Sequence, residues 1–408
     1  MATPVQSAHG YMNAPPLRIG IAGLGRAFSI MLPTFTQDSR VRLVAATDPQ
    51  AQASARFVSD FGGTVHSSVE ALCADPQVQV VYVATPHQSH CQHVCMAAAH
   101  GKHVLVEKPM AITLEDCSTM VRACRTAGVH LIVGHSHSFD LPILHLRALV
   151  TSGKYGSVRM ITASNYTDFL YRPRRPEELD TRCGGGVVFS QGAHQVDIVR
   201  LIGGGLVRTV RAFTGNWDTT RPTEGAYSAL LGFEGGAFCS ATYSGYAHYD
   251  SDVLLDNIGE NGFPKKRADY GAARRRLALA NSANDEAQLK ASRNYGGSLY
   301  TPPALAEGML HQHFGHMLVS CDKADLRPTP AGIEIHGDEA QLVEALPPPT
   351  VPRVEVIDEL CRCVTEGTPA LHSGEWARAT TEVCLAILES ARSGADCRLQ
   401  FQVAARAS

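Results

Sequence analysis

An apolar run that ends in a glycine turn constrains the fold of this chain more than any other feature. The run 17–22 stops at Gly23-Leu24-Gly25, and a second apolar run, 41–47, ends in Asp48. A strand that feeds a glycine turn and then a helix lets backbone amides approach a pyrophosphate closely. An acid that closes the next strand accepts hydrogen bonds from the hydroxyls of an adenosine ribose. The pairing predicts a dinucleotide-binding Rossmann domain, with Gly23, Gly25 and Asp48 at the cofactor.

The fingerprint departs from its usual form at one place. The third small residue of the pattern is replaced by Phe28, and Ala27 lies one position early. That third residue serves close helix–strand packing, so we expect a slightly displaced helix and a retained site, with Arg26 and Ala27 beside the cofactor. No arginine follows Asp48 directly to receive a 2′-phosphate, and the acid itself would repel one. The pattern therefore favours NAD over NADP.

Length and charge exclude several classes of function. A chain of 408 residues suggests two domains, and a net charge of −3 offers no basic field for nucleic acid. No apolar run is long enough to cross a membrane, and the first sixteen residues lack the charged and apolar regions of a secretory signal. We therefore expect a flexible tail over 1–16, a cytoplasmic protein and twelve reduced cysteines.

The pattern of apolar segments divides the chain near residue 140. Short strands alternate with amphipathic helices over 17–140, which predicts a parallel sheet with right-handed crossovers. Long strands joined by glycine-rich turns follow, which predicts a mostly antiparallel sheet. The strands are expected at 17–22, 41–47, 78–84, 103–106, 130–134, 157–168, 206–216, 225–233, 236–246, 251–259 and 397–402. The helices are expected at 26–36, 50–60, 67–74, 88–100, 113–127, 187–202, 353–366 and 375–393.

The chain is thus an α/β protein with an NAD-binding Rossmann domain over 17–140 and an α+β domain for substrate and oligomer contacts over 141–408. The segment 260–308 fits neither pattern, since cationic residues outnumber carboxylates there and only 272–292 favours helix. We interpret it as an inserted arm. A solvated surface excursion, a subunit contact and a lid over an anionic substrate all remain open for it.

Two turns follow strands of the predicted parallel sheet and carry polar side chains. Ala84-Thr85-Pro86-His87 leads to His90, and Glu107-Lys108-Pro109 follows the next strand. Ligands bind at the carboxyl ends of such strands. Lys108 can therefore bond a substrate hydroxyl and balance the negative charge that develops as the proton leaves. We assign Thr85, Pro86, His87, His90, Glu107 and Lys108 to the cofactor and Lys108 to catalysis as well. The Lys108–Pro109 bond can be cis.

A second candidate for proton transfer follows three glycines. Gly184-Gly185-Gly186 precedes a helix on which Ser190, His194 and Asp197 share one face. A histidine there can exchange a proton near neutral pH, although a single helical histidine is more often structural. Two histidine groups, at 87, 90 and 93 and at 311, 313 and 316, lack a familiar four-ligand spacing. We therefore predict no metal.

These motifs, taken in order, resemble the Gfo/Idh/MocA family of nicotinamide-dependent oxidoreductases. The resemblance implies a Rossmann domain followed by an open antiparallel sheet that often forms dimer or tetramer contacts. It also implies that the lysine of Glu-Lys-Pro and the histidine of the second motif, Lys108 and His194, flank the substrate. Many members have an aspartate four residues before that histidine, where this chain has Ser190. A serine cannot stabilise an imidazolium as a carboxylate does, so the proton relay must differ.

Within the family, three stretches resemble members that oxidise a phthalate 4,5-cis-dihydrodiol. They are 23–28, 134–140 and 171–176. The resemblance implies a small anionic cyclic diol as substrate, whose carboxylates Arg172, Arg174, Arg175 or Arg182 can bind, although a solvated basic loop is equally compatible. The remaining candidates for the substrate pocket are His135, His137, Tyr166 and Ser190.

The sequence therefore predicts an NAD-dependent dehydrogenase that oxidises a cis-dihydrodiol of an aromatic dicarboxylate to a catechol. A sugar or cyclitol dehydrogenase of the same family is the first alternative. A regulator that senses NAD without catalysis is the second, although such a protein has no need for Lys108 and His194.

Overall fold

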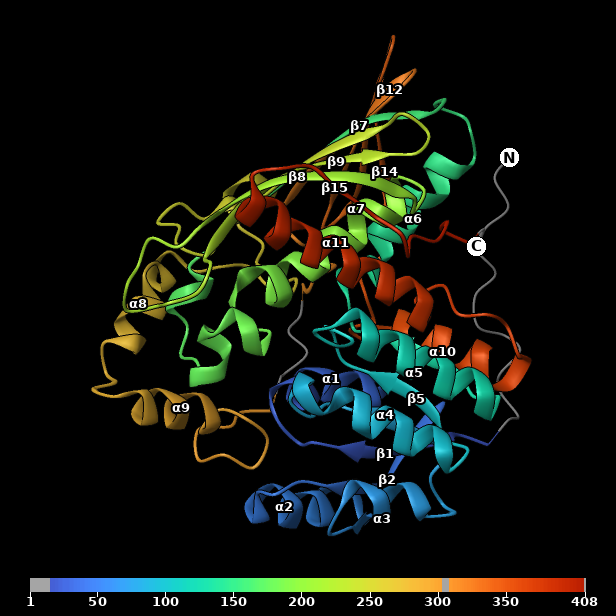
Figure 1. Ribbon diagram of the computed structural model, residues 1–408, viewed down its shortest axis with the longest axis vertical. Helices are drawn as coiled ribbons and strands as arrows, with labels where there is room; N and C mark the ends of the chain where they lie inside the picture. The colour runs from blue at the N-terminus through green and yellow to red at the C-terminus, as the bar shows by residue number, and fades with distance from the viewer. Residues whose placement is uncertain (1–14, 303–307, 407–408) are drawn as a thin grey trace.

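The alternating N-terminal segments form a six-stranded parallel sheet in the computed structural model, which describes residues 15–302 and 308–406 (Figure 1). Its strand order is β3-β2-β1-β4-β5-β6, and every pair is parallel. The strands are β1 (Leu17–Ala22), β2 (Val41–Thr47), β3 (Thr64–Val65), β4 (Val80–Val83), β5 (His103–Val106) and β6 (Leu131–Val133). The helices are α1 (Arg26–Gln37), α2 (Ala51–Phe61), α3 (Val69–Ala74), α4 (His90–Ala99) and α5 (Leu114–Ala127). This confirms the predicted Rossmann architecture. Most of the expected tail, 1–14, lies outside the described residues.

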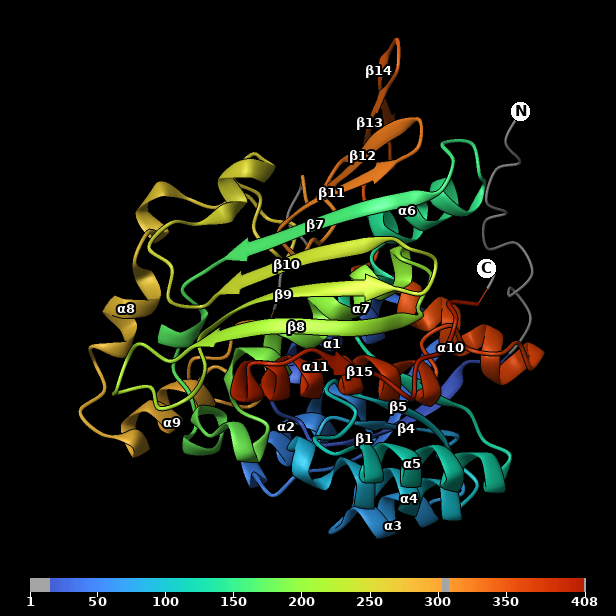
Figure 2. The same ribbon diagram turned by 45° about the horizontal axis from the view of Figure 1, so that its top comes forward.

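The second sheet has nine strands in the order β14-β13-β12-β11-β7-β10-β9-β8-β15. All its pairs are antiparallel except β10 with β7, which confirms a mostly antiparallel sheet. The strands are β7 (Val158–Tyr166), β8 (Val207–Gly215), β9 (Ala226–Phe233), β10 (Phe238–Ser244), β11 (His316–Cys321), β12 (Ala324–Thr329), β13 (Gly332–Gly337), β14 (Gln341–Ala345) and β15 (Cys397–Arg398). The helices α6 (Leu141–Thr151), α7 (Ala193–Ile202) and α11 (Gly374–Ser393) pack on one face, and Figure 2 shows the other face open.

One predicted strand is wrong, and five observed strands, β3 and β11 to β14, are missing from the prediction. Residues 251–259 do not extend, because a short 3-10 helix spans Ser251–Leu255 and the Asp250 carboxylate accepts a hydrogen bond from its first turn. Asp256 and Asn257 then adopt φ of 57°, in the left-handed region, which ends any extended segment. The strands β11 to β14 were not predicted, although they alternate buried and exposed residues in part.

The two halves exchange segments, so the boundary at residue 140 separates the sheets but not the cores. The helix α10 (Val354–Glu366) buries Val356, Ile357 and Leu360 in the core of the parallel sheet. Asp197 of α7 accepts hydrogen bonds from the Trp376 indole and the Thr380 hydroxyl of α11. Burial of these polar groups is compensated by their mutual bonds, which join α7 to α11 at the centre of the molecule.

The inserted arm is part helical, as expected, and spans both halves (Figure 1). Its helices are α8 (Ala272–Leu277) and α9 (Ala283–Ala291). Arg274 of α8 lies over the Tyr171 ring and donates to the Tyr246 carbonyl, while the backbone amide of Tyr295 donates to the Ser29 hydroxyl on α1. The Tyr295 ring also packs edge-on against Phe28, at 5.1 Å between centroids. The large residue at position 28 thus anchors the arm to the Rossmann half.

Candidate active site

The glycine turn and Asp48 form one hydrogen-bonded unit at the carboxyl edge of the parallel sheet. Asp48 accepts hydrogen bonds from the backbone amides of Leu24 and Gln50, each at 2.7 Å. Because β2 and β5 are parallel members of one sheet, Asp48 and Lys108 follow their strands at the same edge. The acid therefore orders the turn beside which a ribose is expected.

The geometry of this turn fits a dinucleotide. Gly23 has φ of 98°, and a Cβ there would lie 2.8 Å from the Ala84 carbonyl oxygen, so only glycine fits against β4. A Cβ on Gly25 would meet nothing within 4 Å, which leaves open space above the turn. Gly25 caps α1 without a side-chain bond, so the first amides of α1 are available to an anion. Arg26 and Ala27 begin that helix.

His90 braces the two turns from behind. Its ring is buried, with Nε2 at 2.9 Å from the Thr85 carbonyl oxygen and Nδ1 at 3.1 Å from that of Pro109. Burial lowers the pKa of His90 to about 4, so its ring is neutral. His90 thus acts on a cofactor only through the backbone that it holds. Its neighbour His87 instead contacts the Cys183 carbonyl at 3.1 Å, across to the second half.

Lys108 crosses from the Rossmann half to the helix that carries His194. The Lys108–Pro109 peptide bond is cis, and Nζ donates to the Ser190 carbonyl at 2.7 Å. Burial lowers the pKa of Lys108 to about 8, opposed by the charge of Glu107. Glu107 itself accepts a hydrogen bond from the Tyr82 hydroxyl. A lysine with this pKa carries a proton at neutral pH and can release it with little cost.

The predicted helix 187–202 begins with a π-helical turn over Val188–Gly192. The wider turn changes the register between Ser190 and His194, and such turns are frequent at functional sites. His194 is 6 % exposed, and its Nδ1 is buried without a hydrogen-bond partner among the described residues. Burial and the charges of Lys108 and His137 hold the pKa of His194 well below its usual range. His194 is therefore a neutral, unpartnered imidazole.

The pocket-wall histidines form a buried cluster around Asp140, which the sequence interpretation missed. The carboxylate of Asp140 lies 2.6 Å from Nδ1 of His137 and 3.1 Å from Nε2 of His135. Nε2 of His137 lies 3.3 Å from Glu260, which the sequence interpretation also missed. The His-x-His-x-x-Asp spacing was visible in the sequence, but Glu260 lies 123 residues away from His137 and carried no local signal.

The side-chain ligand atoms of His135, His137 and Asp140 lie within 4.8 Å of one another, close enough for a metal ion. Each of the three is instead paired with another member of the cluster. The charge of Arg353 acts on His135, and those of Arg353 and Lys108 act on His194 beside it, so a dication would meet repulsion. A site without metal stays our prediction.

The structure separates the four candidate arginines. Arg174 lies 3.6 Å over the Phe169 ring and donates to the Phe169 carbonyl, and Arg175 pairs with Glu177. Arg182 is 89 % exposed and pairs with Asp180. Arg172 interacts with Glu260, Tyr243 and Arg26 of the site, and Arg174 also interacts with Tyr243 and with Lys108. Arg172 is the better candidate for a substrate anion, because the Arg174 guanidinium already bonds to the Phe169 carbonyl.

The prediction that Tyr166 lines the pocket is wrong. Along β7, Ile161, Ala163 and Asn165 are buried, whereas Tyr166 is 36 % exposed on the other face with Met160. Side chains alternate along a strand, and the prediction assigned Tyr166 to the wrong face. Tyr243 of β10 takes the inward place, where its hydroxyl lies 2.9 Å from that of Thr167.

The class of protein follows from the strand order and from the glycine turn with Asp48. Together with Lys108 and His194 on facing segments, these features are typical of an NAD-dependent oxidoreductase. Comparisons with known proteins give the family. Residues 17–135 match the oxidoreductase family with an NAD-binding Rossmann fold, and residues 143–263 match the GFO/IDH/MocA C-terminal domain. The chain belongs to the Gfo/Idh/MocA family and is an NAD-dependent dehydrogenase that acts on a small molecule.

Similar proteins cover almost the whole chain. The 1-carboxy-3-chloro-3,4-dihydroxycyclohexa-1,5-diene dehydrogenase of Comamonas testosteroni is 48 % identical, over 92 % of this chain and 95 % of that protein. The crystal structure of a dehydrogenase from Bordetella bronchiseptica RB50 is 40 % identical, with a TM-score of 0.88 over 94 % of this chain and 100 % of that chain. The WlbA dehydrogenase of Bordetella pertussis, solved with NADH and UDP-GlcNAcA, is 21 % identical over 95 % of this chain and 99 % of that one. Its TM-score of 0.69 shows a shared fold.

Within the described residues, no helix combines the length and hydropathy needed to cross a bilayer.

Proposed function

We propose that this enzyme oxidises a cis-dihydrodiol of an aromatic dicarboxylate, of the phthalate 4,5-cis-dihydrodiol type, to the corresponding catechol. The observation that carries the proposal is the placement of Lys108 and the neutral His194 together at the Rossmann edge, with Arg172 in electrostatic contact with the same site. The relative from Comamonas testosteroni, named for a dihydroxycyclohexadiene that bears a carboxyl group, supports the substrate class.

The residues supply the proton chemistry of such an oxidation. Lys108 donates a hydrogen bond to the substrate hydroxyl and stabilises the developing alkoxide, and His194 accepts the hydroxyl proton. When bound, NAD would supply the acceptor for the hydride that leaves the same carbinol carbon. The C–O bond thereby becomes a ketone, and transfer of the remaining ring C–H proton to its oxygen gives the catechol. Formation of the aromatic ring drives the two reaction steps forward, so the protein needs only to orient the substrate and to balance the developing charge.

The charge of the site favours an anionic substrate. Arg172 interacts with Arg26 of the glycine turn and with Arg276 of the arm, and Arg276 interacts with Arg293. Among the described residues, the guanidinium groups of Arg26, Arg276 and Arg293 have no hydrogen bond or ion pair, and only their backbones are bonded. Guanidinium groups that repel one another are stabilised by an anion between them, and a carboxylate matches their planar geometry. The arm thus acts as a wall for an anionic ligand rather than as a free surface excursion.

A substrate panel tests this function. NADH formation is measured with phthalate 4,5-cis-dihydrodiol, an uncharged benzene cis-dihydrodiol, myo-inositol and glucose. We expect a kcat/KM for the carboxylated diol at least one hundredfold above the neutral compounds. Preference for inositol or glucose would favour a cyclitol or sugar dehydrogenase. Tight NAD binding without turnover of any compound would favour a regulator.

We also propose a homo-oligomer, a dimer or tetramer, that forms through the open face of the nine-stranded sheet (Figure 2). Met160, Phe213, Leu230 and Phe238 are exposed apolar residues of β7, β8, β9 and β10. Such a contiguous apolar face marks an interaction surface. Light scattering should report more than one subunit, and Leu230→Asp should lower the mass to that of a monomer. A monomeric wild-type protein would contradict the proposal.

A further inference from the structure

We propose that Glu260 of the inserted arm, together with Asp140, holds His137 as an imidazolium and so positions the charge that keeps His194 unprotonated and ready to accept the substrate proton. Glu260 and Asp140 are positioning residues in this proposal, which rests on the function proposed above. They take the place of the aspartate that relatives carry where this chain has Ser190.

The geometry places one histidine between two carboxylates and leaves its neighbour with none. Nδ1 of His137 lies 2.6 Å from Asp140, and Nε2 lies 3.3 Å from Glu260. Both nitrogens must carry a proton to donate to both carboxylates, so the ring is the imidazolium form. Its ring centroid lies 4.8 Å from that of His194, which has no carboxylate partner and an unpartnered Nδ1. A proton shared by this pair therefore resides on His137.

The groups around both rings agree with this assignment. Asp140 and Glu260 raise the pKa of His137 to about 8, although burial lowers it. Burial, Lys108, His137, His135 and Arg353 all act to lower the pKa of His194. Glu260 is in turn stabilised as an anion by His137, Arg172 and His313. Phe314, which carries no charge, also packs against both rings.

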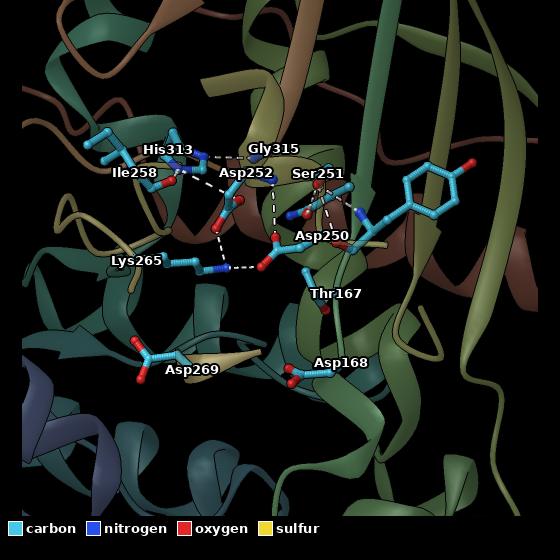
Figure 3. A network of polar contacts seen from close by, with 12 residues as sticks. Thr167, Asp168, Asp250, Ser251, Asp252, Ile258, Lys265, Asp269, His313 and Gly315 are labelled. Carbon is cyan, nitrogen blue, oxygen red and sulfur yellow. Dashed lines mark hydrogen bonds and ion pairs between the residues drawn. The ribbon is translucent and has the colours of Figure 1, made fainter. Parts of the chain in front are cut away.

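The loop that carries Glu260 is bonded to the rest of the domain on both sides of Glu260, through Ile258 and through Lys265 (Figure 3). Lys265 pairs with Asp250 at 2.6 Å and with Asp252 at 2.5 Å. His313 bonds to the Ile258 carbonyl at 2.9 Å, and its backbone amide donates to the Glu260 carbonyl at 3.3 Å. These contacts tie residues 258–265 to the segment that follows β10 and to the segment that precedes β11.

The proposal makes a specific prediction for the proton balance. When Glu260 becomes a neutral amide, His137 loses one of its two counter-charges and is deprotonated at neutral pH. His194 then loses a cationic neighbour, and its pKa rises. Lys108 also loses the favourable charge of Glu260, so its pKa falls further. The pH range in which Lys108 is protonated and His194 is neutral therefore narrows from both ends.

The test is the pH dependence of kcat/KM for Glu260→Gln, measured as NADH formation with the carboxylated diol from pH 5 to 10. We expect the pH range of activity to narrow, with the basic limb moving to lower pH because Lys108 loses the favourable charge of Glu260, and with unchanged NAD affinity by tryptophan fluorescence. The control is Asp256→Asn, which makes the same chemical change on an exposed residue of the same loop in a conformation that asparagine tolerates. A pH profile of Glu260→Gln that keeps the width of the wild-type profile would overturn the proposal.

A second measurement separates this inference from the proposed function. The ionisation of His137 is followed by NMR of protein labelled with 13C in the histidine rings, and the signal that is lost in His137→Gln identifies it. We expect His137 to titrate near pH 8 in the wild type and below 7 in Glu260→Gln. A wild-type His137 that titrates near 6.5 would refute the inference even if the diol is oxidised. A wild type that oxidises no diol would refute the function and leave this titration to decide the inference.

Discussion

His90 and His194 are both buried histidines near the same edge of the parallel sheet, and the difference between them shows what makes a histidine reactive. Both nitrogens of His90 lie against backbone carbonyls of two turns, and its neutral ring donates to one of them. His194 has a buried nitrogen without a partner, and cationic neighbours keep it neutral. A buried polar atom that is left unsatisfied costs stability, and such a cost is tolerated where the atom has a chemical task. We therefore expect substitutions at the two regions to separate stability from turnover.

The largest effect should come from Lys108→Ala. Removal of the ammonium group eliminates the donor to the substrate hydroxyl and the charge that stabilises the alkoxide. We expect kcat to fall by about two orders of magnitude or more, with NAD affinity changed less than about threefold. Stopped-flow measurement of NADH formation and fluorescence titration of NAD give the two values. An unchanged kcat would remove Lys108 from the chemistry.

The next effect concerns the cofactor end of the same edge. Asp48→Ala removes an expected ribose contact and also the acceptor for the Leu24 amide. We expect the Kd for NAD to rise about tenfold to one hundredfold, since a hydrogen bond to a charged group contributes about 1.5–3 kcal/mol. The kcat at saturating NAD should change little, and isothermal titration calorimetry reports the affinity. A loss of kcat with unchanged affinity would place the cofactor elsewhere.

The cofactor end of the site also shows how much of the structure could be predicted from the sequence. Gly23, Asp48 and Lys108 each lie at the end of a strand that the local pattern revealed, and topology then fixes their common edge. The substrate half lacks such a rule. Glu260 contacts His137 from the inserted arm, far away in the sequence. The sequence did not reveal which face of the second sheet is buried, so it pointed to Tyr166, whereas Tyr243 has the buried side chain. Contacts between distant segments depend on packing, and no local spacing encodes them.

A smaller effect, on the KM for the substrate, should distinguish Arg172 from the exposed Arg182. We expect Arg172→Gln to raise the KM for a carboxylated diol about tenfold and to leave that for a neutral diol unchanged, because one carboxylate contact is lost. Arg182→Gln is the matched control, since Arg182 is exposed and pairs only with Asp180 among the described residues. Equal losses with both diols would mean that Arg172 supports the fold of its loop rather than substrate recognition.

The smallest effect is on stability and concerns His137. Its pKa in the folded protein is about 8, above the usual value near 6.5, so its contribution is fully present below pH 6.5 and is lost as the pH rises through 8. The shift corresponds to about 2 kcal/mol, of which a part will be measurable. We expect the difference in unfolding free energy between wild type and His137→Gln to shrink by about 1–2 kcal/mol from pH 6 to 9 in urea titrations. His90→Gln provides the opposite case, because burial lowers the pKa of His90 to about 4, so its contribution is present above pH 6.5 and begins to be lost as the pH falls toward 6. A constant difference for His137→Gln would show that the carboxylates of Asp140 and Glu260 do not hold a charged ring.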